Sequence, residues 1–141
     1  MEWKSTDDLS QELMSQPDLD AYIHENQAFF ASRSMLDLLN TLYDHAGISK
    51  AELSRRSCIS EVYMHQVFSG RRRPSRDRLL CICFGLEATL EEAQELLKLA
   101  DYAALYPRHR REAIIAHGII YRTDLRQVND RLFAENEKTL F

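Results

Sequence analysis

The segment SCISEVYMHQVFSGRRRPSR, residues 57–76, contains the features that decide how this chain folds. Ser60 is well placed to cap a short helix that extends to Ser69, and Gly70 is a residue type that commonly ends one. A cluster of arginines follows within eight positions: Arg71, Arg72, Arg73, Arg76 and Arg78. A short helix beside a cluster of guanidinium groups indicates a surface suited to phosphates, although the helix begins with the acidic Glu61.

A second short helix is expected just before this one. Ser49 and Glu52 have the spacing of a capping box, and the helix that they begin extends through Ser57. Only Cys58 and Ile59 separate this helix from the next cap. Two brief capped helices with so tight a joint predict a helix-turn-helix arrangement, in which the second helix projects from the body of the protein.

Helical periodicity extends along nearly the whole chain, and no stretch alternates in polarity for long enough to predict a strand. Serine or threonine stands where most of the helices should begin, as is typical of N-caps. These patterns predict an all-α fold of about nine helices. Besides the two above, the expected helices are 6–15, one beginning at Pro17, one from Ser34 to a stop at Gly47, one capped by Ser75 and closed at Gly85, one capped by Thr89, one over 110–121 and one capped by Thr123.

Charged residues are distributed unevenly along the chain, whose formal net charge is −4. Residues 1–30 contain one basic and seven acidic residues, whereas residues 31–85 contain nine basic and five acidic ones. The chain therefore has a basic middle segment inside an acidic protein. We expect three units: an acidic helical N-terminal extension (1–33), a helix-turn-helix domain (34–100) and a C-terminal helical extension (101–141).

The stretch GISKAELSRRSCISEVYMHQVFSGRRRPSRDRLLCICFGLEATLEEAQELL, residues 47–97, resembles a known family. The matching features are a leucine and a small residue in one helix (Leu53, Ser54), apolar core positions (Ile59, Met64, Val67) and an S-G-R-R-x-P-S segment. They are similar to those of the lambda-repressor-like helix-turn-helix transcriptional regulators of bacteria, of the Cro/repressor or xenobiotic-response-element type. The resemblance implies a five-helix lambda-repressor-like core, with the N- and C-terminal helical extensions outside it.

The resemblance also implies which residues contact double-stranded DNA, with residues 60–69 as the recognition helix in the major groove. The base-contacting positions fall on Glu61, Val62 and Gln66. The phosphate contacts at the helix starts fall on Ser49, Lys50 and Ser60. The following loop places Ser69, Arg71, Arg72 and Arg73 beside the DNA backbone, and Arg76 begins the next helix close by.

The side chains of the recognition helix differ in how well they suit a base. The amide of Gln66 can bond adenine through two hydrogen bonds, and Val62 can pack against a thymine methyl group. The carboxylate of Glu61 can only accept, for instance from cytosine N4, and phosphates repel it. Glu61 is therefore expected either to select a base or to weaken DNA binding in general.

Two positions depart from the family pattern. Cys58 stands at a turn position that is commonly glycine, so it must adopt a left-handed conformation or alter the turn. Some phage members join the first and third helices by an arginine–glutamate pair, and the matching residues here are Tyr43 and Phe68. Apolar residues can replace a buried ion pair without loss of stability, so this difference does not argue against the fold.

These observations predict a sequence-specific DNA-binding transcriptional regulator that acts as a homodimer. The C-terminal helices of residues 110–141 are the expected dimer contact, since their apolar residues exceed what a terminal helix pair can hide. These residues are Leu125, Val128, Leu132, Leu140 and Phe141. The arginine cluster is also consistent with a merely solvated loop.

An alternative is a helical protein-interaction module on a helix-turn-helix scaffold, which binds a partner protein rather than DNA. The acidic N-terminal extension is the expected contact for such a partner. An intermediate expectation is that this extension folds over the basic face and inhibits DNA binding until it is removed.

Other classes of protein lack support in the sequence. No G-x-S-x-G motif, phosphate loop or metal-ligand spacing is present, so we expect no catalytic site, no metal and no cofactor. The three cysteines are expected to be reduced, mostly buried thiols. No apolar run approaches the ~20 residues of a membrane helix, and residues 1–14 are acidic, unlike a secretory signal, so a cytoplasmic location is expected.

Overall fold

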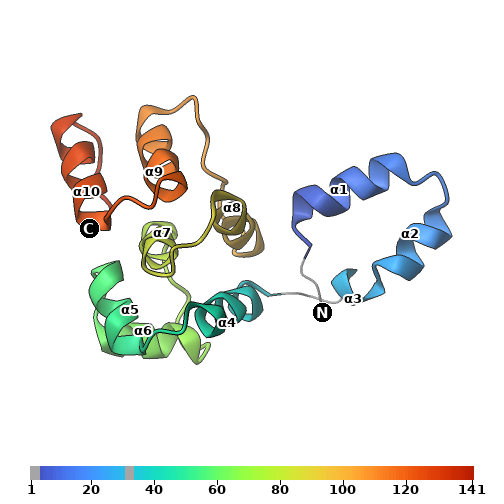
Figure 1. Cartoon of the computed structure of the whole chain (residues 1–141), viewed down its shortest axis with the longest axis horizontal. Helices are drawn as coiled ribbons and strands as arrows, with labels where there is room; N and C mark the ends of the chain where they lie inside the picture. Colours follow the sequence, from blue (N-terminus) through green and yellow to red (C-terminus); the bar gives the residue numbers. More distant parts are fainter. Residues whose placement is uncertain (1–3, 31–33) are drawn as a thin grey trace.

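The computed structural model describes residues 4–30 and 34–141, and within these ranges it contains ten α-helices and no strand (Figure 1). The predicted all-α fold is confirmed. The helices are α1 (Thr6–Ser15), α2 (Leu19–Glu25), α3 (Gln27–Phe30), α4 (Met35–Ala46), α5 (Lys50–Ser57), α6 (Glu61–Phe68), α7 (Arg76–Gly85), α8 (Leu90–Leu99), α9 (Arg110–Ile120) and α10 (Leu125–Ala134).

Most helix starts follow the predicted capping chemistry. The N-caps of α4 to α8 are serines and a threonine whose hydroxyl accepts a hydrogen bond from the backbone N–H three residues later. The capping box of Thr89 and Glu92 is confirmed. The one predicted for Ser49 and Glu52 is half formed, because the Glu52 carboxylate instead accepts hydrogen bonds from Arg55 and Arg56.

Three predicted boundaries near the ends of the chain are wrong. α2 begins after Asp18 rather than at Pro17, and α10 is capped by Asp124 rather than Thr123, since in both places an adjacent carboxylate accepts the free N–H groups. The expected second helix breaks at Asn26, whose buried side chain donates to Tyr22 O at 3.0 Å. This break accounts for ten helices in the described ranges where about nine were expected.

Helices α4 to α10 share one apolar core. Leu39 (α4), Leu53 (α5) and Leu80 (α7) are fully buried, and so are Ile115 (α9) and Leu132 (α10). α5 and α7 cross most closely at Gly85, where an added Cβ would lie 2.2 Å from Ser57 Oγ and 2.8 Å from Leu53 Cδ1. The predicted close of this helix at Gly85 is confirmed, because Gly85 is the last residue of α7, and the lack of a side chain there permits the close approach.

The C-terminal extension contributes side chains to that core. Leu125, Val128, Leu132 and Leu140 are all buried within the monomer. The argument that these four residues form exposed dimer surface is therefore wrong, because the extension packs on α7 and α8 instead of standing apart. Of the five residues predicted, Phe141 is exposed.

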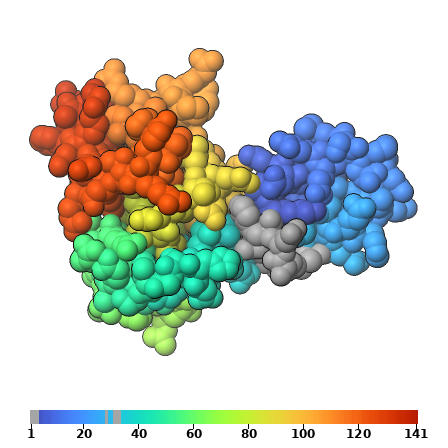
Figure 2. All heavy atoms as spheres, in the orientation of Figure 1, coloured from blue at the N-terminus to red at the C-terminus, as the bar shows by residue number. Residues whose placement is uncertain are grey.

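The N-terminal helices α1 to α3 lie to one side of the other helices, as Figure 1 shows, and form a separate lobe in Figure 2. Their polar contacts with the rest of the described chain are made on α8. The backbone N–H of Thr6 donates to Glu95 Oε2 at 2.7 Å, its hydroxyl donates to Glu95 Oε1 at 2.5 Å, and Lys98 Nζ lies 3.0 Å from Asp7 Oδ1. We call residues 4–30 the arm.

Several helices end at residues with a left-handed backbone that are not glycine. They are Cys58, Glu87, Asp101, Arg122 and Asn136, with φ between 52° and 62°. In each case the next residue's N–H donates to a carbonyl five residues earlier, as in Schellman-type helix ends. The predicted glycine stops at Gly47 and Gly70 are confirmed, with φ of 66° and 81°.

Candidate nucleic-acid interface

α5 and α6 meet through a turn of three residues whose geometry follows from its hydrogen bonds. Cys58 adopts φ 55° and ψ 37°, the left-handed conformation expected where the family commonly has glycine. The N–H of Ile59 donates to Ser54 O at 3.2 Å, and the Ser54 hydroxyl donates back to Ile59 O. Because Ile59 is also buried, the turn fixes the direction in which α6 leaves α5.

α6 has one buried and one exposed face. Tyr63, Met64, Val67 and Phe68 are buried, as helical spacing of i, i+1, i+4 and i+5 requires. The opposite face carries Glu61, Val62, His65, Gln66 and Ser69, and Val62 is 69% exposed. All three predicted base-contacting residues therefore lie together on the outward face of α6.

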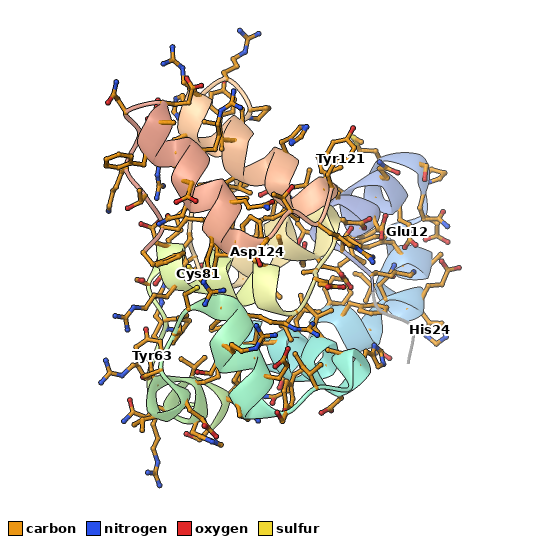
Figure 3. The ribbon with its side chains drawn as sticks, turned by 60° about the vertical axis from the view of Figure 1, so that its left-hand side comes forward. Glu12, His24, Tyr63, Cys81, Tyr121 and Asp124 are labelled. Carbon is orange, nitrogen blue, oxygen red and sulfur yellow. The ribbon has the colours of Figure 1, made fainter. Side chains whose placement is uncertain are left out.

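Arg72 is bound to that face by two contacts. Its Nε donates to Gln66 Oε1 at 2.9 Å, and its guanidinium carbon lies 4.9 Å from the centroid of the Tyr63 ring. The guanidinium of Arg78 lies 4.3 Å from the same centroid, so two cations flank one aromatic ring. Figure 3 labels Tyr63 among nitrogen-bearing side chains at the edge of the molecule. Arg78 was not among the predicted DNA contacts, although it belongs to the arginine cluster in the sequence.

Lys50 is positioned by two aromatic side chains. Its Nζ lies 4.0 Å from the Tyr43 ring centroid and 4.7 Å from that of Phe68, and the two rings are 5.1 Å apart. Tyr43 and Phe68 thus replace a salt bridge by an aromatic contact, as their positions suggested. The contact also holds an ammonium group at the first residue of α5.

The predicted serine contacts are all helix-cap residues. The hydroxyls of Ser49 and Ser60 accept from the N–H groups of Glu52 and Tyr63, at 3.1 and 3.2 Å. Capping uses acceptor capacity, so each hydroxyl proton can still be donated to a phosphate oxygen. Ser69, at the other end of α6, donates its hydroxyl proton to Gln66 O at 3.1 Å.

The arginine cluster divides into two parts. Arg71 and Arg72 are exposed beside α6, and both of their backbone N–H groups donate to Gln66 O. The guanidinium of Arg73 donates to Ala100 O and lies 4.6 Å from the Tyr102 ring centroid. Arg76 pairs with the carboxylate of Glu112 on α9 through both terminal nitrogens. The structure therefore does not bring Arg76 to the surface that carries Gln66.

Comparison with known proteins supports this part of the fold. Residues 35–96 match a family model described as a helix-turn-helix domain. The chain contains a helix-turn-helix domain. No curated protein and no solved structure matches the chain at a significant level.

Two carboxylates of the helix-turn-helix domain have basic side chains as neighbours. His65 Nε2 lies 3.4 Å from Glu61 Oε1, one helical turn away on α6. Hydrogen bonds from Arg55 and Arg56 lower the pKa of Glu52 to about 2. Glu52 therefore stays ionised at neutral pH and offsets part of the positive charge at the end of α5.

Other kinds of site have no support in the helix-turn-helix domain or its flanks. Cys81 and Cys83 are buried, and burial raises the pKa of each thiol to about 12, so neither is a ready nucleophile. No group of three metal-ligating side chains occurs in residues 4–30 or 34–141. None of the helices in these ranges is long and apolar enough to span a bilayer.

Proposed function

We propose that the protein is a sequence-specific DNA-binding transcriptional regulator that places α6 in a major groove. The observation that carries the proposal is the outward face of α6, where Gln66 and Arg72 are bonded to each other beside the exposed Val62. The amide nitrogen of Gln66 stays available as a donor while its oxygen accepts from Arg72. Amide and guanidinium groups are the side chains that most often bond purine edges.

Positive side chains surround this face in a way that suits a phosphate backbone. Lys50 lies at the start of α5, and Arg71, Arg72 and Arg78 lie beside the end of α6. If each neutralised one phosphate, the logarithm of affinity would fall with that of salt concentration at a slope of about −3.6 per monomer. Arg73 and Arg76 would have to exchange an intramolecular partner for DNA, so their contacts are the weaker part of the proposal.

Selection of binding sites from a random DNA pool, followed by anisotropy titrations over a range of salt, tests this function. Arg72→Ala should weaken binding to all sequences and reduce the salt slope by about 1. Gln66→Ala should change the preference at one base step by about 1–3 kcal/mol. Arg131→Ala, which removes an exposed arginine of α10, is the matched control. A pool that never becomes enriched would refute DNA binding.

Glu61 gives a sharper test of how α6 is used. If its carboxylate repels phosphates, Glu61→Gln should strengthen binding to every sequence by a similar factor. If it accepts from a base, the same change should alter preference at one position and leave the others as they were. Equal affinity and equal preference would remove Glu61 from the interface.

A homodimer that presents two copies of α6 to adjacent major grooves is part of the proposal. Such a dimer would place its half-sites about 34–36 Å apart, one turn of DNA. With Leu125, Val128 and Leu132 buried, the contact cannot rest on them. Sedimentation velocity of the protein with and without a selected operator would give the stoichiometry, and one protein per palindromic site would exclude the dimer.

Binding of a protein partner through the arm is a second candidate function. The arm is acidic and exposes apolar side chains on α1 and α2, including Leu13, Met14 (81% exposed) and Leu19. Since the arm contacts α8 rather than α6, its described contacts do not favour inhibition by covering the basic face. Deletion of residues 1–30 should then leave DNA affinity unchanged, whereas tighter binding would restore the autoinhibition model.

A further inference from the structure

A cavity of about 280 Å³ lies where the ends of α5, α7 and α9 meet the start of α10. Its walls carry four arginines, namely Arg55, Arg56, Arg122 and Arg126. Its apolar lining includes Phe84 and Ile119. Figure 3 labels Asp124, another lining residue, at the start of α10. This volume is just below the ~300–1,000 Å³ typical of drug-sized ligand sites, so it suits a compact ligand.

The charges around this cavity do not balance. The four guanidinium groups face two lining carboxylates, Glu87 and Asp124. Glu52, outside the lining, accepts from Arg55 and Arg56 and leaves an excess of one positive charge. The cavity therefore brings four guanidinium groups together beside apolar side chains and carries a net positive charge.

Glu87 is held loosely between two of the arginines. Its carboxylate oxygens lie 3.9 Å from Arg56 Nη1 and 4.0 Å from Arg122 Nη1. Both distances exceed the ~2.7–2.9 Å of a charge-assisted hydrogen bond. The side chain is also 54% exposed, so it can move away at little cost. Glu87 thus partly neutralises Arg56 and Arg122, and an anion that bonds these guanidinium groups at shorter distances would displace it.

From these observations we infer that the cavity binds a compact dianion, either a phosphate monoester or a short dicarboxylate. The planar fork of a guanidinium matches the oxygens of both groups and can bond them in pairs. Two arginines come from α5, and Arg122 and Arg126 flank the turn between α9 and α10, so the ligand would bridge separate elements. Once Glu87 has moved away, the excess rises from one positive charge to two, which a dianion would balance.

The site is connected to α6 through the backbone of α5. Arg126 Nη2 lies 3.4 Å from Arg55 O, in the last turn of α5, and the left-handed Cys58 follows three residues after Arg55. A dianion that draws Arg126 inward would therefore act on the turn that directs α6. This consequence, a change in DNA affinity on anion binding, rests on the proposed function, whereas the binding of the anion does not.

Isothermal titration calorimetry of the full chain at constant ionic strength tests the site without DNA. The probes are inorganic phosphate, glycerol 3-phosphate and succinate, which separate phosphate from dicarboxylate recognition. Arg122→Ala should reduce the affinity for the tightest-binding probe at least fivefold. Glu87→Gln, which removes the competing carboxylate but keeps the side-chain shape, should tighten it about threefold. Arg131→Ala, an exposed arginine of α10 outside this cavity, should leave affinity as in the wild type.

The opposite signs expected for Arg122→Ala and Glu87→Gln distinguish a specific site from general attraction of anions. Absence of binding by all three probes overturns the inference. So does an equal loss in Arg122→Ala and Arg131→Ala, since that pattern reports net charge alone. Anisotropy titrations of a selected operator with and without the bound probe then test the coupling. DNA that never binds would refute the proposed function and leave the calorimetric result intact.

Discussion

The two segments that flank the helix-turn-helix domain are both predicted from the sequence as helical extensions, but they are attached in different ways. The C-terminal extension places Ile115, Leu125, Val128 and Leu132 in the common core. The arm reaches the same core only at its surface, through Thr6 on Glu95 and Asp7 near Lys98. The C-terminal extension is therefore a structural part of the domain, whereas the arm is attached by contacts that water can replace.

The largest expected effect is the loss of folding when the C-terminal extension is removed. Burial of four aliphatic side chains contributes about 6–12 kcal/mol at about 1.5–3 kcal/mol each, close to the whole stability of an ordinary domain. A variant ending at residue 100 should therefore lack a cooperative thermal transition by circular dichroism. The matched variant that begins at Ser34 and keeps the extension should unfold cooperatively. If residues 1–100 fold alone, the C-terminal extension is a separate unit, as the predicted domain boundary at residue 100 implies.

The ion pair between Arg76 and Glu112 should be the strongest single polar link to the C-terminal extension. Both side chains are largely buried, and the other base near Glu112, Arg111, lies 3.9 Å away, so Arg76→Ala would remove the hydrogen bonds of a largely buried carboxylate. We expect a loss of about 3 kcal/mol in the free energy of unfolding, measured by urea denaturation. Arg71→Ala, at an exposed position of the same cluster, should change it by less than about 0.5 kcal/mol. Equal losses of stability in Arg76→Ala and Arg71→Ala would mean that the ion pair between Arg76 and Glu112 does not stabilise the fold.

Gly118 tests how closely the extension packs. An added Cβ would lie 2.6 Å from Val128 Cγ2 and 3.1 Å from Phe84 Cε1. Overpacking of about 1–3 kcal/mol opposes the gain of about 1 kcal/mol that alanine brings to a helix, so Gly118→Ala should destabilise by about 1 kcal/mol. The same change in a Val128→Ala background should destabilise less, because the shortest contact is removed and the one with Phe84 remains. Stabilisation in both backgrounds would show that α9 and α10 are loosely packed.

The smallest effect is expected at the attachment of the arm. Thr6→Val removes the hydroxyl donor to Glu95 and keeps the shape and the backbone donor. Global stability should fall by less than about 0.5 kcal/mol, because Glu95 can be solvated once the arm opens. Hydrogen exchange measured by mass spectrometry should nevertheless become faster in α1. Exchange that stays as slow as in α8 would show that the arm is bound as firmly as the C-terminal extension.

The helix-turn-helix part of the fold could be predicted because its determinants are local. Ser60 lies three residues before the N–H that it caps, and Gly70 is next to the α6 end that it closes. The burial of the core positions Ile59, Met64 and Val67 follows from the family resemblance and is confirmed. For the cap and the glycine stop, the physical cause lies within a few residues of its effect.

The errors arose where a contact joins distant residues. The sequence marks Leu125 and Leu132 as apolar, but it does not say whether a core or a second copy covers them. Arg76 belongs to a basic cluster, and its partner Glu112 lies 36 residues later. The predicted DNA contacts stay predictions. The structure does show that Glu61, Val62 and Gln66 lie on the same outward face of α6.

At the left-handed helix ends, a gain in backbone stability can conflict with the proposed binding of an anion. A non-glycine residue in that conformation costs about 1–2 kcal/mol, part of which glycine would recover. At Asp101 or Asn136 such an exchange would be a simple way to raise thermal tolerance. At Glu87 and Arg122 it would also delete two of the charged groups that line the cavity beside α5. Glycine at Arg122 would therefore be expected to weaken the proposed anion binding, whereas glycine at Glu87 would be expected to strengthen it.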